Sequence, residues 1–522
     1  MHDTPDRPAT PPRRDPTLVG IAVVLAGYVV AAVAGWPQHG RDLLVAAQAA
    51  HGAAPATDHA AAADHAAATA PPPPTVLPFA LLLAAIAILP LVPAASHWWE
   101  HNSSKLLVAG LLGLVTLGYY ALVHRGGVDL HFPAHSVVPA AAAGPSWSAA
   151  GAVLANALLA EYVPFIMLLF ALYVITGGVR IEGDLEATPT VNTAFLGLGA
   201  LIASFIGTTG AAMLLVRPVL ETNRERKHVA HTLVFLIFLV CNCGGCLLPI
   251  GDPPLFLGYL EGVPFLWTMS LWKPWLVTNA LLLAIYWAWD TFWAHPHETK
   301  ADLRRDHRLA GRLRISGLWP NALLMAGVIA AVALLDPSKP LPGTAWHPWI
   351  FLREAVLLAL VALSLALGPA DVRRRNGFTY GAILEVAALF LGIFVCMQPA
   401  LALLDEHGAS LGLDSARAFF WATGSLSSVL DNAPTYLVFF KTAQTLPAAG
   451  PTVAGVDAAR LAAVSLGAVF LGAMTYIGNG PNFMVKAIAE QAGVRMPSFF
   501  GYLVYSFGVL LPVFVLVSLL FL

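Results

Sequence analysis

A carboxylate and an amide lie within a long apolar part of this sequence. The stretch Cys241–Gly258 reads CNCGGCLLPIGDPPLFLG and contains Asn242 and Asp252. Its three prolines do not fit one continuous helix, because proline lacks the N–H donor and crowds the preceding turn. A buried carboxylate inside a membrane is costly and marks a functional site. We therefore expect a broken membrane helix that lines a site; a loop outside the bilayer is the alternative.

Three further apolar stretches are interrupted by small polar residues. They contribute Ser204, Thr208 and Thr209 within 191–220, Ser428, Asp431, Asn432 and Thr435 within 415–440, and Asn479 and Asn482 within 459–494. Hard cations such as sodium and lithium bind carboxylate, amide, hydroxyl and backbone carbonyl oxygens. We therefore predict a cation site where these helices break. The predicted sodium ligands are Asp252, Asp431, Asn242 and Asn479. The alternative is that the amides only cap the broken helices.

The same carboxylates are also candidates to bind protons. Burial disfavours the charged carboxylate and a bound cation favours it, so a proton and a sodium ion compete for one site. Such competition gives obligate exchange if the empty charged site cannot cross the membrane. Glu161 and Glu385 lie nearer span ends and are candidate proton relays, although carboxylates at span ends are often solvated. Lys486 is a candidate to neutralise a carboxylate in the empty state.

The composition indicates that membrane helices hold these residues. Of 522 residues, 58% are hydrophobic and 11% are charged, whereas soluble proteins carry about 25% charged residues. Long apolar runs predict an all-α polytopic protein of about ten to eleven spans, because barrel strands would give short alternating segments. No basic module for nucleic acid is present in the sequence, and no cofactor is expected.

The four cysteines do not indicate a disulfide framework. Three of them, Cys241, Cys243 and Cys246, lie in the interrupted stretch. We interpret them as small packing residues beside the helix break. A soft-metal site is the alternative, but no clustered histidine or further cysteine completes its ligand set.

The chain divides into six segments by composition. They are an N-terminal signal or first span at 1–36, an Ala/His/Pro-rich linker at 37–75, scaffold spans at 76–150, a first transport repeat at 151–294, a basic loop with connecting spans at 295–380, and a second transport repeat at 381–522. The linker has little to bury, and we expect it to be disordered. Short Lys/Arg-rich loops stay cytoplasmic, so the basic loops set the orientation in a bacterial inner membrane.

An internal repeat relates the two transport segments. Glu161 and Glu385 lie 224 residues apart, as do Ser204 and Ser428. The stretches 250–256 (IGDPPLF) and 477–483 (IGNGPNF) follow at an offset of 227. Four spans between the two glutamates would place the halves in opposite orientations. Inverted halves, each with a re-entrant hairpin and a broken helix, are typical of secondary transporters.

These motifs resemble the ion-transporter superfamily, which includes sodium/proton antiporters, citrate and dicarboxylate carriers and arsenite pumps. The matching stretches are GTTGAA at 207–212, NCGGCLLPIGDPP at 242–254, DNAPT at 431–435 and IGNGPN at 477–482. The resemblance covers about residues 76–522 and is strongest to a bacterial sodium/proton antiporter-like branch, some of whose members carry a citrate-transport label. It implies inverted halves that move as an elevator, often within a homodimer.

One departure from this resemblance bears on the cargo. Sodium-coupled dicarboxylate carriers use Ser-Asn-Thr at both hairpin tips, whereas here the second tip contains Asp431. An acidic tip repels a carboxylate unless a cation intervenes. The first hypothesis is therefore exchange of sodium or lithium for protons, and the second is ion-coupled uptake of citrate or a related carboxylate. Oxyanion export and a membrane enzyme rank lower, and no zincin, nucleophile-elbow or Walker motif is present in the sequence.

Overall fold

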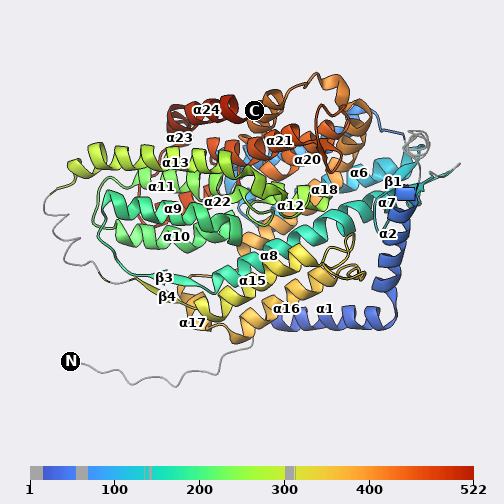
Figure 1. Cartoon of the computed structure of the whole chain (residues 1–522), viewed down its shortest axis with the longest axis horizontal. Helices are drawn as coiled ribbons and strands as arrows, with labels where there is room; N and C mark the ends of the chain where they lie inside the picture. Colours follow the sequence, from blue (N-terminus) through green and yellow to red (C-terminus); the bar gives the residue numbers. More distant parts are fainter. Residues whose placement is uncertain are drawn as a thin grey trace.

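The computed structural model describes residues 16–53, 69–134, 136–139, 141, 144–299, 311 and 313–522. Helices dominate this part of the chain, with three two-stranded antiparallel ribbons beside them (Figure 1). A bilayer offers no water to backbone N–H and C=O groups, so apolar segments satisfy them internally as helices.

The N-terminal region is helical except for one ribbon. Its elements are α1 (Pro16–Val33), α2 (Trp36–Ala53), η1 (Pro73–Val76), α4 (Leu77–Ile88), η2 (Leu89–Leu91), α5 (Pro93–Trp99), α6 (Asn102–Leu122), β1 (Val128–Leu130) and β2 (Ser136–Val138). The first part of the predicted disordered linker is therefore a helix, α2. Its alanines have the highest intrinsic helix propensity, which the disorder prediction underweighted. Residues 54–68 of that linker lie outside the described residues.

The first transport segment contains an interrupted pair and a broken helix. Its elements are α7 (Trp147–Ala155), η3 (Asn156–Tyr162), α8 (Val163–Gly177), β3 (Arg180–Glu182), α9 (Pro189–Ile206), α10 (Thr208–Thr222), α11 (Ala230–Leu239), η4 (Cys243–Cys246), α12 (Pro253–Leu260), η5 (Trp267–Leu271), α13 (Trp272–Trp289), η6 (Asp290–Ala294) and η7 (His295–His297). Gly207 separates α9 from α10 at φ +81°, a conformation that favours glycine.

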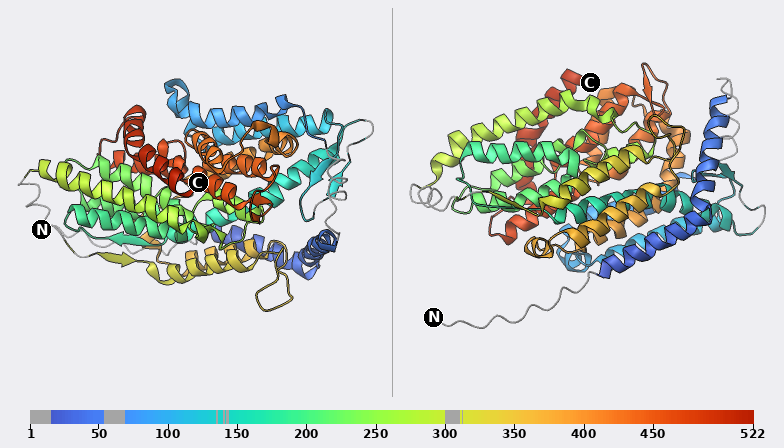
Figure 2. Two further views of the ribbon diagram at one scale, coloured as in Figure 1. Left: turned by 45° about the horizontal axis from the view of Figure 1, so that its top comes forward. Right: turned by 60° about the horizontal axis from the view of Figure 1, so that its bottom comes forward.

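The central segment links the two transport segments. It consists of β4 (Arg314–Ser316), α15 (Leu318–Leu334), α16 (Leu352–Leu367) and α17 (Ala370–Arg375). Strand β4 pairs with β3, and α1 packs along α16 (Figures 1 and 2). Most of the predicted basic loop, 300–310, lies outside the described residues.

The second transport segment follows the same order as the first. Its elements are α18 (Gly381–His407), η8 (Gly408–Leu411), α19 (Ala416–Ser427), α20 (Asn432–Gln444), β5 (Thr452–Val453), β6 (Val456–Asp457), α21 (Ala458–Leu471), η9 (Gly472–Met474), α22 (Gly480–Gln491), α23 (Phe499–Tyr505), η10 (Ser506–Leu510) and α24 (Leu511–Phe521). The second arm of each hairpin packs on the broken helix of the other segment, α10 on α22 and α20 on α12. The polar residues of the two segments are thereby brought to one place.

Several of these helices are long and apolar enough to cross a membrane. In the described part of the chain they are Pro16–Val33, Asn102–Leu122, Trp147–Gly177, Pro189–Ile206, Gly381–Leu411 and Phe499–Phe521, and the bent pair Pro73–Ile88 and Pro93–Trp99 would make a seventh. Shorter apolar helices are Ala230–Cys246, Leu318–Leu334 and Ala458–Met474. The chain is a multi-pass membrane protein. The predicted ten to eleven spans and the inverted relation of the halves remain predictions.

Candidate functional site

Asp252 is the buried carboxylate at the centre of the site. It lies in extended backbone immediately before α12, at φ −144° and ψ 142°, and is 1% exposed. Thr208 Oγ1 donates to its Oδ1 at 2.9 Å, and Asn432 Nδ2 donates to its Oδ2 at 2.7 Å. The backbone N–H of Thr208 also donates to Gly251 O at 2.8 Å. The carboxylate is therefore held by residues from both hairpins.

Asn479 occupies the corresponding extended position before α22, at φ −153° and ψ 138°. Its Nδ2 lies 3.0 Å from Cys241 O, 3.2 Å from Asp252 Oδ1 and 3.3 Å from Asn242 Oδ1. An amide nitrogen carries only two hydrogens, so it satisfies at most two of these three acceptors, and Asp252 Oδ1 also accepts from Thr208 Oγ1. The opposite orientation of this amide would place its oxygen against all three acceptors. Several buried oxygen atoms therefore converge on one amide nitrogen.

Two further asparagines extend this acceptor-rich centre. Asn242 Nδ2 donates to Asn482 Oδ1 at 2.8 Å, while Asn482 Nδ2 donates to Gly472 O and Thr475 O. The Oδ1 atom of Asn432 is buried and has no hydrogen-bond partner among the described residues. An unpaired buried oxygen costs about 1–3 kcal/mol. A cation or a proton would satisfy these surplus acceptors.

The second hairpin contributes its asparagine rather than its aspartate. Asp431 is partly buried, and its Oδ1 accepts the N–H of Ala433 and thereby caps α20. Its charge is near enough to act on Asp252, but the two carboxylates share no hydrogen bond. Thr435 Oγ1 donates to Asp431 O one turn back. The structure thus places Asp431 beside the centre, as a cap, with its side chain turned from the Asp252 contacts.

A serine next to the predicted one lies at the core of the second hairpin. Ser428 Oγ donates locally to Ser425 O, whereas the buried Ser427 Oγ donates to Ala468 O at 2.7 Å. In the first segment, Ser204 Oγ donates to Gly244 O at 2.6 Å. Ser427 is therefore the residue that corresponds to Ser204 in contact. The offset of 224 residues in the sequence favoured Ser428 as the counterpart of Ser204. The structure gives the corresponding contact to Ser427, at an offset of 223.

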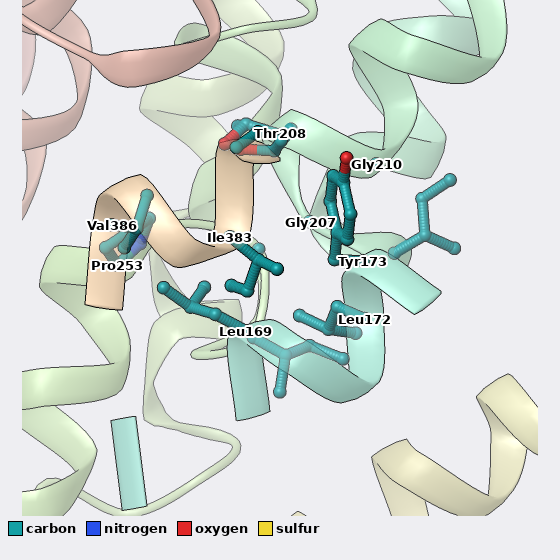
Figure 3. A pocket seen from close by; sticks show the side chains of 14 residues that line it. Leu169, Leu172, Tyr173, Gly207, Thr208, Gly210, Pro253, Ile383 and Val386 are labelled. Carbon is teal, nitrogen blue, oxygen red and sulfur yellow. The ribbon is translucent and has the colours of Figure 1, made fainter. Parts of the chain in front are cut away.

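A small cavity lies beside the first hairpin tip. It has a volume of about 80 Å³. Figure 3 shows Leu169, Leu172 and Ile383 on one side of it and Thr208 on the other. Thr209 also lines it, and among the described residues no charged side chain does. The tip thus faces an apolar space between α8 and α18.

The three candidate relay residues lie in different environments. Glu161 is 8% exposed, and Gln398 Nε2 donates to its Oε1 at 3.1 Å. Glu385 is partly exposed and pairs with Lys105 at 2.7 Å. Lys486 pairs with Glu490, one turn along α22, at 2.8 Å. None of the three contacts the Asp252 centre in the described part of the chain.

Two contacts near Glu161 were not predicted from the sequence. Gln398 occurs in α18 as a lone amide before Pro399, and such a polar residue inside an apolar run is the only local signal. Lys441 Nζ lies 2.6 Å from Glu261 Oε2 and joins α20 to the end of α12. The 180 residues between the two partners leave no signal of their pairing in the sequence.

Comparison with protein families shows to which class of protein this chain belongs. Residues 123–522 match the profile of a family described as "Putative citrate transport". The chain belongs to this family. It is a membrane transporter of the ion-transporter superfamily and not an enzyme. A comparison with curated proteins gives no match. At the centre, none of the described Lys or Arg side chains pairs with Asp252.

Proposed function

We propose that this protein is a secondary active transporter in which a cation at Asp252 is coupled to the movement of citrate or a related carboxylate. The single observation that carries the coupling site is the group of buried oxygen atoms around Asp252, of which Asn432 Oδ1 has no hydrogen-bond partner among the described residues. Family membership supports the carboxylate cargo. The coupling cation is sodium, lithium or a proton, with Asp252 as its charged ligand and Asn242, Asn432 and Thr208 supplying further oxygens.

Electrostatics explains why the carboxylate must travel with a cation. Two like charges about 4 Å apart repel by roughly 4 kcal/mol at an effective dielectric constant of 20. An ionised Asp252 without a paired Lys or Arg would therefore oppose a carboxylate bound at the same tip. A cation at Asp252 cancels this repulsion and leaves the Gly-Thr-Thr tip open to an anion. Citrate carried as a metal complex satisfies the same requirement.

Alternating access gives these groups a transport cycle. We propose that the two transport segments are inverted repeats, that the breaks beside Asp252 and Asn479 lie near the bilayer midplane, and that the protein works as a homodimer in the bacterial inner membrane. Because each hairpin packs on the broken helix of the other segment, the site would move as one unit. The empty carboxylate would be costly to move across the membrane, and this cost enforces coupling.

Exchange of sodium for protons is a second candidate function. It is favoured by the uncharged lining of the cavity and by the absence, among the described residues, of a cationic side chain paired at the centre. In that case Asp252 would bind sodium and protons in turn, with no carboxylate cargo. Asp431, beside Asp252, would raise the local preference for a cation.

Purified protein in proteoliposomes separates the two functions. One arm measures uptake of labelled citrate under an imposed sodium or proton gradient, and the other measures collapse of a pH gradient on adding sodium without citrate. We expect citrate uptake that depends on a cation gradient and is lost in Asp252→Asn. Asp371→Asn, an exposed residue of α17, is the control and should transport normally.

Each arm has a result that counts against the proposal. Sodium-driven proton movement without citrate, lost in Asp252→Asn, would replace the carboxylate proposal by the second candidate. Gradient-driven citrate uptake that survives in Asp252→Asn would remove Asp252 from the coupling site.

A further inference from the structure

A second buried carboxylate, separate from Asp252, lies on helix η3. Glu161 is 8% exposed, and η3 is a π-helical turn between α7 and α8. Such turns are rare and frequently occur at functional sites. Helix η3 packs against α18 and α12, so Glu161 faces both a long span and the end of the first broken helix. Its position is therefore between a long span and the first broken helix.

The carboxyl group of Glu161 is only half satisfied. Gln398 Nε2 donates to Oε1 at 3.1 Å and also contacts Phe394 O at 3.2 Å, which fixes the nitrogen toward the glutamate. The Oε2 atom is buried and has no hydrogen-bond partner among the described residues. A buried carboxylate without a cation in contact costs several kcal/mol. Addition of a proton converts this group into a neutral acid with one O–H.

The charged groups around Glu161 include more carboxylates than ammonium groups. Lys441 on α20 pairs with Glu261 at 2.6 Å, and both act electrostatically on Glu161. Asp405 on α18 also acts on Lys441. The single ammonium is already matched by Glu261, so an ionised Glu161 would be uncompensated. A proton on Glu161 reduces that excess by one charge without disturbing the Lys441–Glu261 pair.

The ligand chemistry at this place suits a proton and not a metal ion. Gln398 presents its N–H₂ group, which is a donor, to the carboxylate, whereas a hard metal ion needs several oxygen ligands. Among the described residues, no group of three or more His, Cys, Asp or Glu side chains is arranged to hold a metal.

We propose that Glu161 is a second proton-binding site, which titrates separately from Asp252 and responds to the position of the Lys441–Glu261 pair. Movement of the hairpin relative to α8 and α18 would bring the Lys441 ammonium nearer to or farther from Glu161. Because an approaching ammonium favours the ionised carboxylate, such a movement would release the proton. The proposal does not depend on whether the cargo is citrate or sodium.

Infrared difference spectroscopy of the purified full-length protein tests this directly. Spectra are recorded in lipid while the buffer changes from mildly acidic to mildly alkaline, and protonated carboxyl bands are followed. We expect Glu161→Gln to remove one carboxyl band and Asp252→Asn to remove a different one. Gln398→Leu should keep the Glu161 band and move it to higher frequency, because the donor to Oε1 is lost.

The control is a second glutamate within a candidate membrane span, one that has a cationic partner. Glu385 pairs with Lys105 at 2.7 Å, so Glu385→Gln should leave every protonated carboxyl band in place. Glu161→Asp keeps a carboxyl group and should retain a shifted band, which separates loss of the group from loss of folding. The proposal is overturned if Glu161→Gln has all the wild-type bands, or if Glu385→Gln loses the same band as Glu161→Gln. These readouts need no transport, so a failed transport assay would not affect them.

Discussion

The two helix breaks have similar backbones but different chemistry. In the first, a Cβ atom added at Gly251 would lie 2.2 Å from Gly245 O; in the second, one added at Gly478 would lie 2.6 Å from Gly472 O. Each glycine is followed by an extended residue that begins the next helix, Asp252 in one break and Asn479 in the other.

The pairing of an acid, Asp252, with an amide, Asn479, explains how the centre can carry a charge and still be stable. The amide of Asn479 donates to the carboxylate of Asp252 at 3.2 Å. Two carboxylates at that distance would repel unless a proton or a cation lay between them, while two amides would carry no charge to neutralise. One acid and one amide therefore give a centre with a single exchangeable positive charge.

A charge swap between the breaks tests this interpretation most severely. We expect Asp252→Asn to reduce cation-dependent transport by about 100-fold or more, because it removes the only carboxylate among the described residues that is in hydrogen-bond contact with the centre. The double variant Asp252→Asn with Asn479→Asp restores the charge one contact away and should recover roughly tenfold. Transport rates in proteoliposomes measure both effects. A double variant no better than Asp252→Asn would show that the two positions are not interchangeable.

Alanine at either glycine of the breaks should destabilise the protein. The added Cβ of Gly251→Ala or Gly478→Ala would meet a carbonyl oxygen and a second backbone atom closer than van der Waals contact. Overpacking of this kind costs about 1–3 kcal/mol. Thermal unfolding in detergent measures the loss. Gly480→Ala is the control, since nothing lies within 4 Å of its Cβ; equal unfolding temperatures for all three would contradict the close packing.

The two serine contacts should contribute similarly to the two hairpins. Ser204→Ala removes the acceptor of the buried Leu247 N–H, and Ser427→Ala removes the side-chain donor to Ala468 O. Leaving a buried polar group unpaired costs about 1–3 kcal/mol. Ser428→Ala removes only a local bond to Ser425 O and should be nearly neutral. Thermal unfolding again measures the difference. If Ser428→Ala were the more damaging of the adjacent pair, the assignment of Ser427 as the partner of Ser204 would be wrong.

Much of this centre could be predicted from the sequence because glycine and proline interrupt apolar runs. Gly207, Pro253 and Pro254 mark breaks that the structure contains at those points. A buried Asp252 must find donors, and the nearest polar residues in the other breaks were the only candidates. The structure accordingly brings Asp252 together with Thr208, Asn242, Asn432, Asn479 and Asn482.

The remaining features depend on tertiary packing that local pattern does not encode. Which of Ser427 and Ser428 faces the core is set by the residue at which α19 ends. Asp431 and Asn432 are adjacent and both polar, and only the geometry of the α20 start makes one a helix cap and the other a hydrogen-bond donor to Asp252. Family membership favours a carboxylate cargo over simple sodium/proton exchange. The acidic hairpin tip, taken alone, favoured sodium/proton exchange.

The starts of the two broken helices differ as well, and this difference should be visible as a small pH effect. Asp457 ends strand β6 directly before α21, outside the apolar helices, whereas Val229, directly before α11, gives that helix no side-chain cap. Burial raises the pKa of Asp457, but the N–H groups of Arg460, Ala459, Gly450 and Ala449 donate to its carboxylate and hold the pKa below its ordinary value.

A carboxylate whose pKa is lower in the folded than in the unfolded protein stabilises the fold at pH values above its unfolded pKa of about 4. This stabilisation is lost as the pH falls through its folded pKa. We therefore expect Asp457→Asn to lower stability by about 1 kcal/mol at neutral pH, the usual size of a helix cap. The difference between wild type and Asp457→Asn should shrink as the pH falls below about 4, because the unfolded chain then binds a proton more readily than the native carboxylate, whose pKa is lower. Unfolding temperatures measured across this range in one detergent provide the test, with Asp414→Asn, in the loop before α19, as the control. A gap that stays constant with pH would mean that the Asp457 charge does not stabilise the start of α21.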